Sequence, residues 1–194
     1  MNKKVTSRTL KALETRKNIL ECGIRLIGEK GIDKVSIEEI AKAAGVSVGT
    51  FYYYYPSKKE LLQGMPWRID KYFEQEVVEK LTAESCAENI KTFFYYYARH
   101  TKMHGWQIIK NLFITDTAFV ISDKRYLQLV LLDLVNKGQN SGEVSCGLSA
   151  KQIMRLMLIA AHGVVLDWAM VRGKSNVFTD MQEVTGRLFN SFLV

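Results

Sequence analysis

The segment 36–62 constrains the fold of this chain more than any other part of the sequence. Ser36 followed three residues later by Glu39 is a capping box, so a helix is expected to begin directly after the serine. Gly45 can adopt the positive φ that a sharp turn after a helix often needs. Ser47 can cap the helix that follows. The pattern therefore predicts two short helices joined by a tight turn.

A third helix is expected immediately afterwards. The second helix, expected over 48–54, ends before Pro56, because proline cannot continue a helix interior. Ser57 and Glu60 form a second capping box, so the third helix is expected to start near Lys58. This is the plan of a helix-turn-helix, whose second helix enters the DNA major groove. An ordinary helical hairpin with the same caps is the alternative.

The outward face of the second helix favours DNA over the hairpin. Residues 52–55 are four consecutive tyrosines, and successive side chains fan around a helix axis, so they cannot all be buried. Exposed large aromatics usually mark a binding surface, and tyrosine hydroxyls are good donors to phosphate. Lys58, in the first turn of the third helix, is slightly unfavourable there unless an anion lies nearby. The candidate contact residues on the second helix are Val48, Gly49, Thr50, Tyr52, Tyr53 and Tyr54.

The first third of the chain resembles the TetR family of bacterial transcription regulators. The residues that carry the resemblance are Ile19, Leu20, Leu26, Gly31, Ser36, Ile37, Ile40, Ala41, Ala44, Gly45, Val46, Ser47, Gly49, Thr50, Phe51, Tyr52, Tyr54, Tyr55, Pro56, Ser57, Lys58, Glu60, Leu61 and Leu62. The resemblance implies three N-terminal helices that bind DNA and a helical C-terminal domain that binds a small ligand and dimerises. It further implies base reading by Val48 and Tyr53, and phosphate or base contacts by Ser36, Ser47, Thr50, Tyr52, Tyr54 and Lys58.

Two positions depart from the family pattern. Tyr54 stands where many members have histidine, and Tyr55 stands where most have phenylalanine. We expect the first change to alter a contact with the DNA backbone and the second to be neutral in packing.

The charge distribution agrees with a DNA-binding N-terminal region. The formal net charge is +7, and residues 1–64 carry 12 lysines and arginines against 7 acidic residues. Most of the basic excess therefore accompanies the helix-turn-helix, as a phosphate-binding surface requires. The first 17 residues are basic in particular. They fit either a flexible arm that reaches DNA or a solvated basic tail.

The whole chain is expected to be all-α, with about nine helices and two domains. Residues 1–62 would form the helix-turn-helix domain, and residues 63–194 a helical ligand-binding and dimerisation domain. Pro66 should end or kink a helix near Gly64, which makes either a hinge or a simple bend. Later helices are expected from Ser85 to just before Gly105, over 106–115, over 122–137 with a stop near Gly138 to Gly142, from Ser149 to Gly173, and from a Thr179 cap onward.

The last two of these helices are the candidates for dimerisation. Small and apolar side chains recur along both at helical spacing, and two helices from each of two subunits can form a four-helix bundle. A stripe that belongs only to the monomer core is the alternative. The candidate interface residues are Leu156, Ala160, Gly163, Val164, Asp167, Val184, Leu188 and Phe192.

A ligand pocket is expected in the aromatic-rich region 67–135. Such side chains also fill ordinary helix cores, which is the alternative for each of them. The candidate ligand-binding residues are Phe73, Phe94, Tyr97, Trp106, Phe113, Asp116, Tyr126 and His162. His100 and His104, four residues apart, have a spacing that can hold a metal, but two histidines make only a weak site, and we expect no metal or other cofactor.

The remaining features favour a reduced, cytoplasmic, non-enzymatic protein. Cys22, Cys86 and Cys146 show no metal-ligand spacing, and a plain structural role is favoured over redox sensing. No apolar run reaches the roughly 18 residues that span a bilayer, so no membrane partner is expected. No catalytic motif is present.

The sequence therefore predicts a ligand-responsive transcriptional regulator. It would be a homodimeric repressor that binds a palindromic operator in double-stranded DNA and is released by a small apolar or aromatic effector. A DNA-binding protein of the same fold without a small-molecule effector, architectural or partner-controlled, is the alternative.

Overall fold

The computed structural model describes residues 7–62, 65–115 and 125–194. These residues form ten α-helices, and the β-structure among them is limited to one isolated bridge between Val144 and Leu193. The predicted all-α fold is confirmed.

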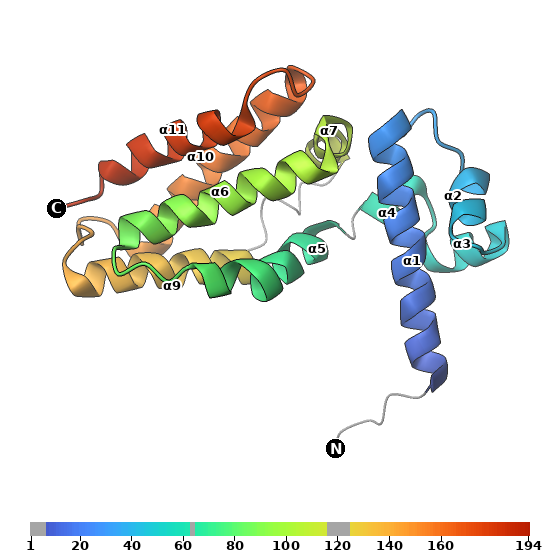
Figure 1. Ribbon diagram of the computed structural model, residues 1–194, viewed down its shortest axis with the longest axis horizontal. Coiled ribbons are helices and arrows are strands. Elements are labelled where there is room, and N and C mark those ends of the chain that lie inside the picture. Colours follow the sequence, from blue (N-terminus) through green and yellow to red (C-terminus); the bar gives the residue numbers. More distant parts are fainter. Residues whose placement is uncertain (1–6, 63–64, 116–124) are drawn as a thin grey trace. The chain divides into compact units, whose positions relative to one another are not determined.

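The chain divides into two compact units, residues 1–64 and 65–194 (Figure 1). The N-terminal unit contains four helices, α1 (Ser7–Lys30), α2 (Ile37–Ala43), α3 (Val48–Tyr54) and α4 (Lys58–Leu62). Helix α1 packs against α2 and α4, and α2 packs against α3.

A small core holds this unit together. Its fully buried side chains come from all four helices and include Ile19, Ile27, Ile40, Phe51, Leu61 and Leu62. Gly23 allows α1 and α4 to approach closely, because a Cβ atom at this position would lie 2.7 Å from a methyl carbon of Leu61. The packing positions of the helix-turn-helix thus lie on one continuous apolar face.

The C-terminal unit begins with a helix that changes its winding. Helix α5 (Met65–Tyr72) passes into a π-helical turn (Phe73–Val77) and a 3₁₀ turn (Val78–Lys80). Pro66 is the second residue of α5, a position in the first helical turn where its missing N–H is no loss. The predicted break near Gly64 lies outside the described residues.

Five longer helices complete this unit. They are α6 (Cys86–His104), α7 (Trp106–Thr115), α9 (Tyr126–Ser141), α10 (Ala150–Met170) and α11 (Val177–Asn190). Helix α11 packs against α6 and α10, and α10 also packs against α7 and α9 (Figure 1). The core between them is rich in aromatic side chains, including Phe73, Phe93, Phe94 and Phe189.

One predicted helix limit needs correction. The last helix is capped by Asn176 and not by Thr179, because the Asn176 Oδ1 atom accepts hydrogen bonds from the backbone N–H groups of Phe178 and Thr179. Helix α9 ends at Ser141, where Gly142 has a φ of +80°, within the predicted stop between Gly138 and Gly142. The predicted start of α9 at residue 122 lies outside the described residues.

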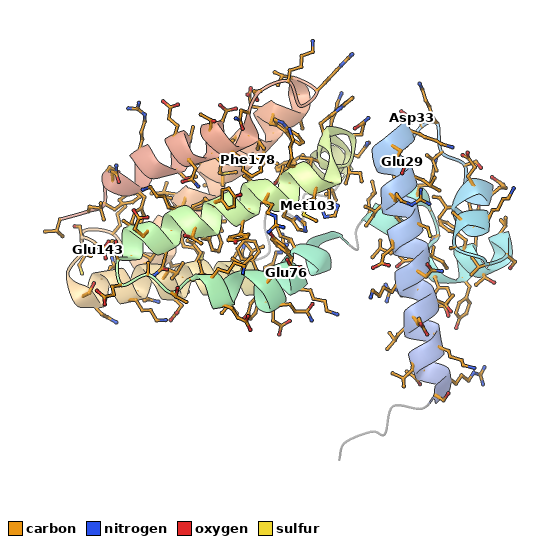
Figure 2. All side chains as sticks on the ribbon, viewed as in Figure 1. Glu29, Asp33, Glu76, Met103, Glu143 and Phe178 are labelled. Atoms are coloured by element: carbon orange, nitrogen blue, oxygen red, sulfur yellow. The ribbon has the colours of Figure 1, made fainter. Side chains whose placement is uncertain are left out.

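Glu143 provides a cap that the sequence pattern did not reveal. Its carboxylate accepts hydrogen bonds from the Ser85 hydroxyl at 2.8 Å and from the backbone N–H groups of Cys86 and Ala87 at 2.6 and 2.8 Å. It lies at the start of α6, far from α6 in sequence (Figure 2). A carboxylate at a helix N-terminus is favourable because of the helix dipole, so Glu143 ties the loop after α9 to α6.

Helix α10 is long and apolar enough to cross a membrane by length and composition alone. Half of the window that meets this test is buried inside the unit. Packing in the core of a helical domain is therefore sufficient to explain its composition.

Candidate functional site

The caps predicted for the helix-turn-helix are formed. The Ser36 Oγ atom accepts from the Glu39 backbone N–H at 3.1 Å, and the Glu39 carboxylate accepts from the Ser36 N–H at 2.9 Å. At the start of α3, the Ser47 Oγ atom accepts from the Thr50 N–H at 3.0 Å. The first backbone N–H groups of a helix have no acceptor within the helix. These bonds supply one in α2 and in α3 and so stabilise the first turn of each.

The turn between α2 and α3 depends on Gly45. Its φ is +67°, which side-chain-bearing residues rarely adopt, and the next N–H group, from Val46, donates to the Ala41 carbonyl at 2.9 Å. The Asn18 side chain of α1 donates to the Ala44 carbonyl at 2.8 Å. Helix α1 thus holds the turn in place, and the turn sets the angle between α2 and α3.

Helix α3 has one buried face and one exposed face. Phe51 is fully buried and Tyr55, just after the helix, is 4% exposed, whereas Tyr52 and Tyr53 are 51% and 80% exposed. The exposed Gly49 lies on the same short helix, with only the Ser47 hydroxyl within 4 Å of the position of a Cβ atom. A capped helix that presents tyrosines and an open glycine to solvent has the features of a recognition helix.

Tyr55, which stands where most family members have phenylalanine, makes specific contacts in the N-terminal unit. Its hydroxyl donates to the Arg16 carbonyl of α1 at 3.1 Å, and the Arg16 guanidinium lies 5.6 Å from its ring centroid. Burial raises the pKa of Tyr55, so the hydroxyl stays a donor. Tyr55 therefore tethers the end of α3 to α1, which goes beyond neutral packing.

The basic N-terminal stretch is helical over its described part. Residues 7–17 form the first half of α1, and Figure 1 shows this half extending beyond α2 and α3. Leu10 and Leu13 are each 56% exposed there, and burial along α1 begins only at Ile19. Residues 7–17 are therefore helical, and contact between this stretch and DNA remains a proposal.

Lys58 has a structural role that charge arguments alone did not reveal. Its ammonium donates to the carbonyl oxygens of Ile32 and Val35 at 2.6 and 2.7 Å. Both oxygens belong to the loop between α1 and α2, so they supply the negative partner that a lysine in a first helical turn needs. Contact between Lys58 and DNA remains a proposal.

Replacing Lys58 with methionine should destabilise the N-terminal unit by roughly 1–3 kcal/mol, because two carbonyl groups lose a charged donor. Lys59→Met is the matched control, since Lys59 is exposed and adjacent in sequence. Urea denaturation of both variants measures the difference. Equal stability of the two variants would contradict the role of Lys58 in the loop.

A small cavity lies in the C-terminal unit. Its volume is about 20 Å³, enough for roughly one water molecule. Helices α5, α6, α7 and α10 supply its walls. The lining residues are Ile69, Tyr97, His100, Thr101, Ile109, Leu112, Phe113 and Val165.

The residues predicted to bind a ligand are only partly brought together. Tyr97 and Phe113 line the cavity, and the His162 ring lies 6.2 and 5.9 Å from theirs. Phe73 packs behind Tyr97 at 6.4 Å, and Phe94 lies in the core. The remaining three predicted residues do not line it or are not described: Trp106 lies near Gly173, Tyr126 lines a surface groove beside α9, and Asp116 lies outside the described residues.

Ile69, Ile109, Leu112 and Val165 were missed as lining residues, because single aliphatic positions on amphipathic helices carry no sequence signal that distinguishes a cavity wall from a core.

The polar groups beside this cavity have shifted pKa values. Burial raises the pKa of Tyr97 to about 12; the charge of Arg125 lowers this pKa by a smaller amount, and the charge of Asp70 raises it slightly. Burial and then the charge of Arg125 lower the pKa of His162 to about 4. Near neutral pH both side chains are therefore uncharged, and each can hydrogen-bond without carrying a buried charge.

The shift at His162 predicts a loss of stability in acid. The folded-state pKa of about 4 lies below the ordinary value of 6.5, so the unfolded chain takes up the proton first. The stability that the folded state gains from keeping His162 neutral is fully present above pH 6.5 and is lost as the pH falls toward 4. Between pH 7 and pH 5 the loss should be roughly 2 kcal/mol.

Urea denaturation of the parent and of His162→Gln at both pH values tests this. The variant should lose about 2 kcal/mol less than the parent over this interval. An identical pH dependence in the two proteins would contradict the buried neutral state of His162.

The helices predicted to dimerise present an apolar face to solvent. On α10 this outward face includes Leu156, Ile159, Ala160, Gly163, Leu166 and Met170, and Arg155 and Asp167 are its charged members. On α11, Val184 is 41% exposed and Leu188 and Phe192, just after the helix, are half-buried. Val164, which was predicted to belong to the interface, is only 8% exposed and faces the monomer core. Ile159, Leu166 and Met170 also lie on this exposed face and were not among the predicted residues.

The two close histidines lie on α6. The Nε2 atoms of His100 and His104 are 3.2 Å apart, a hydrogen-bond distance. Among the described residues, no group of three or more histidine, cysteine or acidic side chains could hold a metal ion.

The cysteines differ in accessibility. Burial raises the pKa of Cys86 to about 11, and its thiol donates to the Leu134 carbonyl at 3.3 Å, so it is a structural thiol. Cys22 is half-buried and Cys146 is exposed.

Comparison with known proteins identifies the N-terminal unit. Residues 19–65 match the family model described as bacterial regulatory proteins, tetR family. YuxN of Bacillus subtilis, an uncharacterised helix-turn-helix transcriptional regulator, is 32% identical over 81 residues, which cover 42% of this chain and 27% of that protein. YvdT of the same organism is 52% identical over 44 residues, 23% of each chain. The chain thus spans about a quarter of the length of these relatives.

Longer similarities cover both units. The fatty acid metabolism regulator protein of B. subtilis is 27% identical over 164 residues, which cover 78% of this chain and 82% of that protein. The structure of Thermus thermophilus FadR, a TetR-family repressor in complex with lauroyl-CoA, matches with a TM-score of 0.70 at 21% identity, covering 92% and 95% of the two chains. RolR in complex with resorcinol matches with a TM-score of 0.68 at 20% identity, covering 94% and 89%.

The capped recognition helix and the all-helical fold define a helix-turn-helix DNA-binding protein. The match over residues 19–65 and the fold shared with these neighbours specify the class further. The N-terminal unit thus matches the DNA-binding region of the TetR family of bacterial regulatory proteins, and the chain as a whole shares the fold of TetR-family regulators.

Proposed function

We propose that this protein is a cytoplasmic, homodimeric transcriptional repressor that binds a palindromic operator and is released by a small effector with an apolar or aromatic body. The observation that carries the proposal is the exposed face of α3, where Tyr52 and Tyr53 stand in solvent on a helix fixed by its cap and by Phe51. Large aromatic side chains this exposed are typical of a binding surface, and groove recognition needs a helix held rigidly at this position.

The contacts with DNA are assigned by residue. Tyr53, the most exposed tyrosine of α3, and Val48, in its first turn, are proposed to read bases. Contacts to phosphate are proposed for Ser36, Ser47, Thr50, Tyr52, Tyr54 and Lys58, with Gly49 allowing close approach.

Operator binding by a single helix-turn-helix unit would be weak, which supports a dimer. The outward face of α10 repeats at intervals of three and four residues, and Gly163 and Gly186 have no atom within 4 Å of the position of a Cβ atom. Small residues between apolar ones allow helices of two subunits to approach closely. A dimer with its two-fold axis through this face would place one helix-turn-helix unit at each of two operator half-sites.

Release by an effector is supported by the ligand-bound neighbours of this fold, and in this chain the small cavity beside Tyr97, His100 and Thr101 is the proposed place of entry. Neighbours of this fold bind ligands as different as lauroyl-CoA and resorcinol, so the fold does not select the effector. A regulator without a small-molecule effector is the second candidate, and the cavity volume of about 20 Å³ is the observation that favours it.

Selection of binding sequences from random DNA tests the assignment of contacts. Tyr53→Ala should change the preferred bases, whereas Tyr52→Phe should weaken binding to all sequences and leave the preferred bases unchanged. Parent-like affinity and preference in both variants would contradict the assignment. Subsequent release of bound operator by a small molecule would separate the effector-controlled candidate from the second one.

A further inference from the structure

One row of outward side chains on α10 consists of Arg155, Ile159, Gly163 and Asp167. The four residues are spaced four positions apart, and all of them are exposed. Residues at this spacing are offset by roughly 40° around the helix axis, so they form one continuous ridge across the outward face. This row, the α10 ridge, begins with a cation and ends with a carboxylate. A large and a small apolar residue lie between the two charges.

The charges of the α10 ridge are not neutralised within the chain. Neither the Arg155 guanidinium nor the Asp167 carboxylate forms an ion pair or a side-chain hydrogen bond with another residue that the structure describes. They are separated by roughly 18 Å along the helix, so they cannot pair with each other. On α9, by contrast, Asp133 and Lys137 form an ion pair at 2.8 Å. Both ridge charges are therefore available to another molecule.

Two copies of the α10 ridge complement each other when they run in opposite directions. A two-fold axis midway between Ile159 and Gly163 places Arg155 opposite the partner's Asp167, and the same pairing recurs at the other end. It also places Ile159 opposite the partner's Gly163. Beyond the residues adjacent in the chain, no described side chain lies within 4 Å of the position of a Cβ atom at Gly163, so a second copy's isoleucine has room there.

This alignment is also a common mode of helix packing. Aligned rows of residues four apart on two helices give an interaxial angle of about −50°, the most frequent class in globular proteins. Leu156 and Leu166 flank the ridge on opposite sides and are 40% and 38% exposed in the single chain. A second copy would cover them, so the burial of apolar surface favours the same arrangement as the charges.

We propose that the α10 ridge selects a second copy of this chain as its partner, through two reciprocal Arg155–Asp167 pairs around the Ile159–Gly163 contacts. This inference rests on the homodimer of the proposed function, and it adds the register of the interface and the side chains that choose the partner. A protein of the same fold with another order of charges meets like or unmatched charges at this face. The ridge therefore disfavours mixed dimers.

Reversal of one charge at a time should weaken each homodimer. Arg155→Asp places two acidic pairs across the axis, and Asp167→Arg places two basic pairs there. Each variant should dissociate at a concentration at least about tenfold higher than the parent, because like charges are held opposite each other twice. Mixed in equal amounts, the two variants have opposite charges at both ends, so they should form a heterodimer about as tight as the parent dimer.

The doubly reversed variant Arg155→Asp/Asp167→Arg separates pairing from a general effect of charge. It should form a homodimer like the parent, because both pairs are restored in the opposite sense. It should exchange poorly with the parent, because a mixed dimer has one acidic and one basic pair.

Sedimentation of the full-length proteins, alone and mixed in equal amounts over a concentration series, is the test. One protein of each mixture carries a fluorescent label, and circular dichroism checks that helix content is equal. Lys137→Asp and Asp133→Arg are the matched controls, since they reverse the same charges at exposed positions of α9. Both controls should dimerise like the parent, alone and mixed.

Association of Arg155→Asp with Asp167→Arg, but of neither variant with itself, would establish the pairing. Homodimers of both variants as tight as the parent dimer, or a mixture no tighter than either variant alone, would overturn it. If that happens while the parent dimerises and binds operator, the register fails and the proposed function stands. If the pairing holds but the parent binds no DNA, the proposed function fails and the ridge stands. A parent that remains monomeric would overturn both the pairing and the proposed dimer.

Discussion

Replacing Ile159 with arginine is expected to convert the proposed dimer to a monomer and to weaken binding to the proposed operator by on the order of a thousandfold. Ile159 is 55% exposed in the single chain, so the arginine disturbs no monomer packing. It lies at the centre of the outward α10 face, with Leu156 one turn before it and Gly163 one turn after it. A buried pair of like charges across a two-fold interface, together with lost apolar contact, should prevent association.

The matched control is Leu129→Arg. Leu129 is 54% exposed and lies on α9, outside the α10–α11 face. Sedimentation analysis should give a dimer mass for the parent and Leu129→Arg and a monomer mass for Ile159→Arg, with circular dichroism showing equal helix content. Dimers in all three proteins would contradict the proposed interface.

Replacing Phe51 with alanine should cost the N-terminal unit about 3–5 kcal/mol. Phe51 is fully buried and its ring packs near those of Tyr52 and Tyr55, with centroid distances of 5.8 and 6.2 Å. Its removal leaves a cavity in a core that only four helices enclose. Since the unit is small, this loss is a large share of its stability.

Hydrogen exchange of the full chain measures this effect locally. Amides of α2 and α3 should lose protection in Phe51→Ala, while amides of α6 and α10 keep it as an internal reference. Tyr53→Ala, at an 80% exposed position of the same helix, should keep protection in both units. Parent-like protection of α3 in Phe51→Ala would show that the core does not depend on this ring.

The helix-turn-helix was predictable because its determinants are local. Ser36 and Glu39 bond to each other's backbone, and Gly45 takes the conformation its turn requires. Each of these effects involves residues a few positions apart, so the spacing of residue types is enough to identify it. Lys58 shows the limit of this reasoning, because its two carbonyl partners belong to a loop more than 20 residues earlier.

The C-terminal unit was predictable as helical but not in its details. Val164 and Ile159 are both apolar residues of α10, yet one faces the core and the other faces solvent. Which face of α10 is buried depends on the positions of α6, α7, α9 and α11. The sequence pattern along α10 alone does not indicate those positions. The cap by Glu143 and the pairing of Asp70 with Arg125 likewise join residues more than 50 positions apart.

The central claim is that the exposed face of α3 binds a specific DNA sequence as part of a dimer. Binding of the purified protein to DNA from its own upstream region, at two salt concentrations and with random competitor DNA, tests this claim most directly. We expect specific, salt-dependent binding with two protomers per site, because lysines and arginines that neutralise phosphates release counterions. The absence of any binding, even at low salt, would contradict the account.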